Sequence, residues 1–262
     1  MSSSAASAPI RASGSFLALC LDTVVQFFRS VRHGRFQWRE TIEQAWFIAS
    51  VTILPTALVA IPFGAVIALQ IGNLARQVGA QSFTGSASVL AILREAAPIV
   101  CALLISGAGG SAICADLGSR KIREEIDAME VLGISPIERL VVPRVIASMI
   151  VAVLLNGLVS VVGVIGGYIF NVLLQHGTPG AYIQSFTAFA RLPDLYVGEI
   201  KALIFGAMAA LVASYKGLNP KPGPKGVGDA VNQTVIMSFM LLFVINFVIT
   251  GIYFAVDPQR AV

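Results

Sequence analysis

Charge, histidine and cysteine are all scarce in this sequence of 262 residues. Only 12% of the residues are Asp, Glu, Lys or Arg, whereas soluble domains hold about a quarter. The two histidines, His33 and His176, stand far apart. The three cysteines lie in apolar segments without the spacing of metal ligands: Cys20, Cys101 and Cys114. We therefore expect no metal site and no disulfide framework, and we interpret the cysteines as small apolar packing residues.

Sequence motifs for nucleotide binding and catalysis are missing as well. The chain has no GxxxxGKS/T, HExxH or GxSxG sequence. Residues 220–226, PKPGPKG, lack the Lys-Ser/Thr pair that holds a phosphate and Mg²⁺, so a rigid turn is favoured there. We expect no catalytic residue and no cofactor bound by this chain, which argues against an enzyme.

Long apolar runs are abundant instead. Apolar residues make up 56% of the chain, and its mean hydropathy is +0.81. Several runs reach the ~20 residues that cross a hydrocarbon core of ~30 Å. The composition therefore predicts an all-α integral membrane protein. We predict spans at residues 46–71, 89–116, 145–174, 196–215 and 234–256, and a short helix outside them from Pro179 to Phe189.

The N-terminal region differs from these spans. Residues 1–14 are rich in Ser and Ala, lack a signal-peptide pattern and are predicted to be disordered. Residues 15–33 mix large apolar side chains with polar ones such as Arg29 and Arg32. This mixture is too polar for a span and is typical of an amphipathic helix lying in the membrane interface. We interpret residues 15–262 as one membrane domain.

The distribution of basic residues predicts the orientation of the chain. Thirteen of the 18 Lys and Arg residues fall in residues 1–45, 117–144 and 216–231. Because cytoplasmic loops carry the excess of Lys and Arg, we place these three segments in the cytoplasm. Five spans then leave the N-terminus in the cytoplasm and the C-terminus outside the cytoplasmic membrane.

Charged residues inside the predicted spans are few and lie near span ends: Arg94, Glu95, Glu199 and Lys201. Interfacial ion pairing explains such positions more simply than a proton relay does. The spans therefore offer mainly apolar surface, which suits an apolar or amphipathic substrate, or no substrate.

One charged segment, residues 119–143, interrupts the apolar runs. Its apolar residues recur every three or four positions, which predicts an amphipathic helix over about residues 119–135. Ser119 is the expected N-cap, and Gly133 and Pro136 are the expected stop. We expect three ion pairs four residues apart along this helix: Arg120–Glu124, Lys121–Glu125 and Arg123–Asp127. Such a helix either contacts a partner protein or merely connects two spans in solvent.

Small residues are concentrated in the predicted second and third spans. Small side chains let helix backbones approach closely in lipid, and one pair stands at GxxxG spacing. We expect helix packing at these glycines: Gly107, Gly109, Gly110, Gly163 and Gly167.

The run from Arg94 to Ala147, with its motif EIDAMxxxGxxPxxxLVxPR, resembles the signature of MlaE/YrbE-type ABC transporter permeases. Residues 214–235, SYKGLNPKPGPKGVGDAVNQTV, resemble the loop before the last helix of the same family. The resemblance covers residues 15–256. It is strongest to the actinobacterial YrbE branch, which works with MCE proteins.

The resemblance implies an N-terminal interfacial helix, five spans and a cytoplasmic coupling helix between spans two and three. It implies a second permease chain, homologous rather than identical, and two copies of a cytoplasmic ATPase that uses ATP and Mg²⁺. It also implies MCE proteins on the outer face and a lipid substrate that is imported. It implies no nucleic-acid partner. The lipid class stays open among fatty acid, sterol and phospholipid. The implied ATPase contacts are Arg120, Arg123, Glu124, Glu125, Asp127, Glu130, Gly133 and Pro136.

Two positions depart from the family's pattern. Members often carry Arg where this chain has Gly109, and an acidic residue near Asn246 in the last span. Both departures bear on the polar lining of a translocation path. From the residues alone, two other classes stay open: a stand-alone channel or secondary transporter, and a membrane scaffold without transport.

Overall fold

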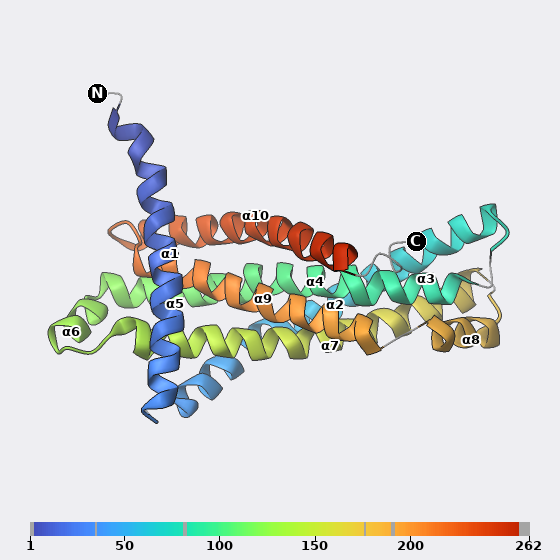
Figure 1. The fold of residues 1–262 in the computed structure, drawn as a ribbon, viewed down its shortest axis with the longest axis horizontal. Helices are drawn as coiled ribbons and strands as arrows, with labels where there is room; N and C mark the ends of the chain where they lie inside the picture. The colour runs from blue at the N-terminus through green and yellow to red at the C-terminus, as the bar shows by residue number, and fades with distance from the viewer. Residues whose placement is uncertain (1–2, 35, 81–82, 176, 190–191, 257–262) are drawn as a thin grey trace. The chain divides into compact units, whose positions relative to one another are not determined.

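The computed structural model describes residues 3–34, 36–80, 83–175, 177–189 and 192–256. These described residues are mostly helical and contain no β-strand. Helices (α) and short π-helical turns (η) follow one another along the chain (Figure 1). Their bounds are α1 Ser3–Arg32, α2 Trp38–Gln77, α3 Thr84–Ala91, η2 Ile92–Ala96, α4 Ala97–Leu104, η3 Ile105–Gly109, α5 Gly110–Ile122, α6 Glu125–Val131, η4 Ile137–Val141, α7 Val142–Gln175, α8 Pro179–Phe189, α9 Leu192–Leu218 and α10 Pro224–Val256.

Six helical stretches are long and apolar enough to cross a membrane: Gly14–Arg32, Trp38–Gln77, Thr84–Ile122, Ile137–Leu174, Pro193–Leu218 and Pro224–Tyr253. Four of the five predicted spans each lie within one of the last five stretches, and the fifth, residues 234–256, overlaps the last stretch up to Tyr253. The first stretch, in α1, has a mean hydropathy of 1.2, against 1.7 to 2.5 for the others. The prediction of an all-α membrane protein with several spans is confirmed.

The chain forms two compact units. Unit 1 consists of Met1–Ala49, Ile105–Met149 and Gly206–Phe243, and unit 2 consists of Ser50–Leu104, Ile150–Phe205 and Val244–Val262. Helices α2, α7, α9 and α10 each contribute one part to each unit.

In unit 1, α1 lies across η4 and the start of α7 (Figure 1). The Phe16 and Tyr215 rings meet edge to face at 5.5 Å between centroids, which also joins α1 to α9. Most large apolar side chains of α1 are nevertheless exposed, among them Leu21 and Phe28. Helix α1 begins at Ser3, within the segment for which the sequence predicts disorder, and the alanines of this segment are strong helix formers.

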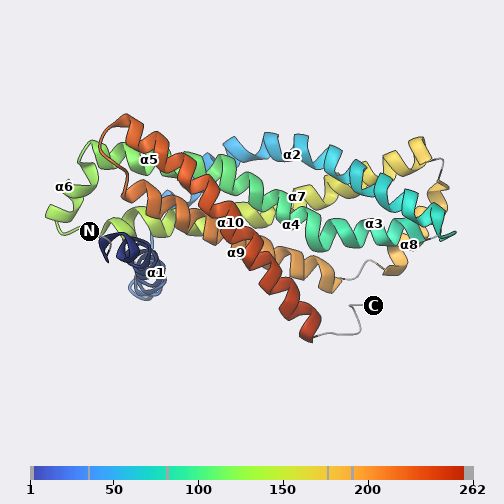
Figure 2. The same ribbon diagram turned by 90° about the horizontal axis from the view of Figure 1, so that it is seen from above.

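In unit 2, α3 and α8 lie side by side (Figure 1, Figure 2). Helix α8 runs from Pro179 to Phe189, as the sequence predicted. A small core of buried apolar side chains joins α2, α4 and α7: Ala60, Ala97, Val100 and Val159.

Two helices extend further than the sequence predicted. Helix α2 continues to Gln77, beyond the predicted span end at residue 71, and α10 begins at Pro224, before the predicted span start at residue 234. Proline suits the first position of a helix because its ring fixes φ and its missing N–H would have had no partner there. The polarity of these stretches therefore marks helix ends as well as loops.

Two of the π-helical turns end two residues before a proline. Pro98 follows η2 and Pro143 follows η4. A proline inside a helix cannot donate to the carbonyl four residues earlier, and its ring crowds that carbonyl. The freed carbonyl needs another donor, and the turn changes register locally.

Candidate functional site

The charged segment forms two helices rather than the single one predicted. Helix α5 ends at Ile122, and α6 begins at Glu125. Between them Glu124 adopts a left-handed conformation with φ 62°, the one described non-glycine residue with positive φ. Ser119 is not an N-cap, because it lies inside α5 and its hydroxyl donates to the carbonyl of Asp116 at 2.8 Å. The coupling helix expected from residue 119 is therefore split at Glu124.

Helix α6 ends at Val131, before the predicted end near residue 135, and Gly133, one of the two residues expected to stop it, follows two residues later. This glycine has φ 73°, a conformation that a residue with a Cβ rarely adopts. Its N–H donates to the Glu130 carbonyl at 3.0 Å, and the Ile134 N–H donates to the Met129 carbonyl at 2.9 Å. These two bonds form a Schellman motif, which satisfies the last carbonyls of α6. Pro136 then stands directly before η4.

The three predicted ion pairs are replaced by others. Arg120 Nε lies 3.1 Å from Asp116 Oδ1, and Arg123 Nε lies 3.0 Å from Glu125 Oε1. Lys121 pairs with Asp127, six residues later. The predicted pairs assumed one continuous helix. The left-handed turn at Glu124 reorients α6, so the i, i+4 relation does not hold across it.

The end of α6 exposes apolar side chains beside acidic ones. Ile126 is 2% exposed and anchors the helix, whereas Val131 is 88% and Leu132 75% exposed. Exposed Glu124, Glu125 and Glu130 lie on the same short helix or next to it. Large apolar residues grouped in the open with a polar rim are typical of a protein contact surface. We call Glu124, Glu125, Glu130, Val131 and Leu132 the α6 surface.

A buried ion pair closes the segment at its base. The Arg144 side chain is fully buried, and its guanidinium donates to the Leu140 carbonyl at 2.8 Å and to the Asp116 carboxylate. Asp116 also accepts from Arg120, so it joins the end of α5 to the start of α7. Sequence reasoning assigned no role to Asp116 or Arg144. The available signal was a charged residue inside each of two apolar runs, one directly after Pro143.

Unit 2 holds a second charged group, which we call the unit 2 cluster. Arg94 Nε donates to Asp194 Oδ1 at 2.8 Å, and Lys201 Nζ donates to Glu95 Oε1 at 2.7 Å. Thr250 Oγ1 and Asn246 Nδ2, both on α10, donate to the Glu95 carboxylate at 3.2 Å each. Three of the charged residues noted in the sequence, Arg94, Glu95 and Lys201, are thus paired. The sequence analysis did not identify their partners Asp194, Asn246 and Thr250.

The Lys201 ammonium also compensates for Pro98. The Arg94 carbonyl lies four residues before this proline, so it receives no bond from the N–H that would normally follow. Lys201 Nζ donates to that carbonyl at 3.1 Å, and to Thr250 Oγ1 at 2.9 Å. With the bond to Glu95, all three N–H groups of the ammonium are used. The Lys201 side chain is only 1% exposed, and these three hydrogen bonds offset the free-energy cost of burying its charge.

Comparisons with known proteins match this arrangement to one family. The family described as Permease MlaE matches residues 41–252. This chain belongs to the MlaE permease family. A probable ABC transporter permease protein of Synechocystis sp. is 32% identical over 87% of each chain, and one of Rickettsia typhi is 32% identical over 82% of this chain and 83% of its own. The intermembrane phospholipid transport system permease protein MlaE of Haemophilus influenzae is 26% identical over 91% of this chain and 97% of its own.

In this MlaE-family chain, the glycines expected to pack helices fall into two groups. A Cβ built on Gly167 would lie 3.5 Å from Ala68 Cβ of α2, and one on Gly163 would lie 3.2 Å from the Ile92 side chain. The backbones of Gly64 and Gly163 approach too closely for a Cβ on Gly64. In η3 and α5, Gly109 and Gly110 are buried, whereas Gly107 faces open space with no described atom within 4 Å of its Cβ position.

Of the two positions expected to depart from the family's pattern, Asn246 makes a contact that suits an amide. Its amide N–H donates to Glu95 at 3.2 Å. An acidic side chain at this position would place a second carboxylate beside Glu95 and remove that donor. The amide therefore suits the pairing found in this MlaE-family chain.

Proposed function

We propose that this chain is the membrane-spanning subunit of an ABC transporter that moves lipids across or out of the cytoplasmic membrane. Membership of the MlaE permease family supports the transporter class, and the relative from Haemophilus influenzae is named for phospholipid transport. Because the sequence has no nucleotide-binding motif, a separate ATPase supplies the energy.

The observation that carries this proposal is the α6 surface. Val131 and Leu132 are exposed at a turn between membrane stretches, surrounded by carboxylates that keep them out of the hydrocarbon core. The basic-residue distribution supports a cytoplasmic position for this turn, with the C-terminus on the other side. An ATPase that offers an apolar pocket and basic residues would bury both features at once.

The Asp116–Arg144 pair supports a mechanical role for the same segment. It joins α5 to the start of α7, the helices on either side of α6 in the chain, so α6 is connected to a fixed point on both sides. A displacement of α6 by closing ATPases would therefore reach two membrane helices together rather than being lost in a flexible loop.

The unit 2 cluster supports an amphipathic rather than a purely apolar substrate. The Glu95 side chain is 40% exposed and that of Arg94 is 21% exposed, although both lie within an apolar membrane stretch. Paired but accessible charges at this depth suit contact with a polar headgroup. They are less suited to a water-filled channel, because the charges satisfy one another.

The remaining partners follow from the likeness to the YrbE branch. We propose a second, homologous permease chain, two ATPase copies, and MCE proteins on the outer face, with import as the direction. The crossing of α1 over η4 and the start of α7, together with its low hydropathy, supports an interfacial position for α1 (Figure 1).

The proposal is tested by changing Glu124. Glu124→Arg reverses the charge on the α6 surface, and we expect loss of ATPase co-purification and of lipid transport while the protein still inserts. Glu124→Asn removes the charge, and asparagine tolerates the left-handed backbone conformation. This variant therefore distinguishes the effect of losing the carboxylate from the effect of disturbing the turn. Lys221→Glu, an exposed reversal between α9 and α10, is the matched control and is expected to retain both activities. Normal ATPase binding and transport by Glu124→Arg would refute docking at α6.

A further inference from the structure

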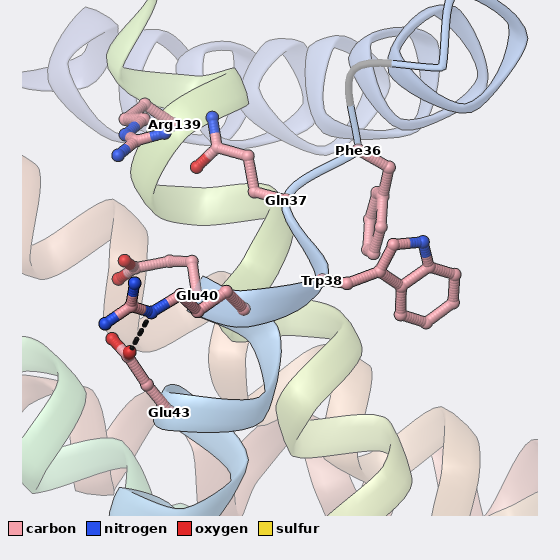
Figure 3. Close-up of a pocket in the computed structure, with 7 residues that line it drawn as sticks. Phe36, Gln37, Trp38, Glu40, Glu43 and Arg139 are labelled. Carbon is pink, nitrogen blue, oxygen red and sulfur yellow. Dashed lines mark hydrogen bonds and ion pairs between the residues drawn. The ribbon is translucent and has the colours of Figure 1, made fainter.

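A polar hollow of ≈ 560 Å³ opens in unit 1 where the chain passes from α1 to α2 (Figure 3). Its volume falls within the ~300–1,000 Å³ of small-molecule sites. Arg139 of η4 faces Gln37 across it, Glu40 and Glu43 line it, and Phe36 and Trp38 stand together at its edge.

Several polar groups in the hollow have capacity for a ligand. Arg139 forms no ion pair with the residues that the structure describes, and the buried Gln37 Oε1 accepts no hydrogen bond from them. Glu40 accepts one bond, from Gln44 Nε2 at 3.1 Å. A ligand with an anionic group and N–H donors would therefore find a cation, an amide oxygen and a carboxylate.

A second cavity in unit 1, of ≈ 240 Å³, is entirely apolar in its lining surface. Helices α1, α7 and α9 enclose it, with Phe27, Val142, Met149, Ala207 and Leu211 among its walls. An apolar cavity of this kind suits a hydrocarbon chain rather than water.

The two cavities adjoin. The Phe27 ring of the apolar cavity and the Phe36 ring of the hollow meet edge to face at 5.9 Å, and Phe36 meets Trp38 at 4.7 Å. On the opposite wall, Arg139 of η4 lines the hollow and Val142, the first residue of α7, lines the apolar cavity, so the chain passes from one cavity to the other within three residues. One molecule with a polar end and an apolar end can thus occupy both cavities.

We propose that unit 1 holds one resident phospholipid, with its headgroup in the hollow and part of an acyl chain in the apolar cavity. Arg139 binds the phosphate. A primary ammonium donates to Gln37 Oε1 and Glu40, so an ethanolamine headgroup is preferred over choline, whose nitrogen has no N–H. This site lies in unit 1, whereas the charges that support substrate contact lie in unit 2. The proposal therefore does not depend on the proposed transport function.

Native mass spectrometry of the full chain, purified in detergent, tests the proposal. We expect one retained phospholipid per chain in the unchanged protein, and its loss in Ala207→Phe, which fills the apolar cavity. Arg139→Gln is expected to lower retention about tenfold, the effect of one charge-assisted hydrogen bond. Leu154→Phe, on a side chain of α7 that is 68% exposed, adds the same kind of bulk outside the cavity and is expected to retain the lipid.

The pattern of lipid retention across the variants distinguishes a phospholipid bound at this site from one bound elsewhere on the protein. Lys201→Met disrupts the unit 2 cluster and is expected to leave the resident phospholipid in place. Loss of the lipid in Lys201→Met alone would place it in unit 2 and overturn the proposal. Equal retention in all variants would show an adventitious lipid only, and would also overturn it. If Ala207→Phe does not fold, Arg139→Gln, at an exposed residue, decides between these outcomes.

Discussion

Removing the carboxylate of Asp116 should destabilise the protein far more than removing its exposed partner. The Arg144 side chain is 0% exposed and that of Asp116 is 30% exposed. Asp116→Asn would leave the Arg144 cation buried without a carboxylate to neutralise it, with only neutral carbonyl oxygens as acceptors. Breaking a buried pair from one side costs ~3–5 kcal/mol, and the partial exposure of Asp116 favours the lower end. We expect a loss of about 3 kcal/mol, which is roughly a hundredfold in the unfolding equilibrium.

The matched control uses the same carboxylate. Arg120 also pairs with Asp116, but its side chain is 34% exposed, so Arg120→Gln should cost less than about 1 kcal/mol. The free energy of unfolding is measured for each variant by reversible SDS titration in mixed micelles. Combining Asp116→Asn with Arg144→Met removes the buried charge and should recover part of the loss. Equal costs for Asp116→Asn and Arg120→Gln would refute the reasoning.

Three further predictions use the same titration. Lys201→Met leaves the Arg94 carbonyl without its donor and Glu95 without its cationic partner, and we expect a loss of at least about 2 kcal/mol in the free energy of unfolding. Gly198→Ala would bring a Cβ within 2.7 Å of the Leu93 carbonyl and should cost about 1–3 kcal/mol, whereas Gly107→Ala, in open space, should change stability by less than about 0.5 kcal/mol. Gly133→Ala should cost about 1–2 kcal/mol because φ is 73°, whereas Glu124→Gly, at φ 62°, should be tolerated; the reverse order would contradict the backbone argument.

The membrane stretches and α8 could be predicted because their signals are local. A run of apolar residues fixes a span wherever it occurs, and Pro179 marks the start of α8 directly. The end of α6 was equally readable, since Gly133 supplies the left-handed residue that a Schellman motif needs.

The candidate site was predicted only in part, because its pairings are not local. The bond between Lys201 and Glu95 joins residues 106 positions apart, and that between Arg94 and Asp194 joins residues 100 apart. No helical period relates such positions. The break at Glu124 was hidden for another reason: glutamate favours helix, so local propensity opposes the conformation that the surrounding structure imposes.

The ammonium of Lys201 limits how the helices around it can move. Its three N–H groups contact the backbone of η2, the side chain of Glu95 and a hydroxyl of α10. A small displacement of α9 along its axis would weaken all three hydrogen bonds together. No new hydrogen bond would compensate until Lys201 reached other acceptors. Movement at this point is therefore expected to occur as a switch between two discrete arrangements rather than as a gradual drift.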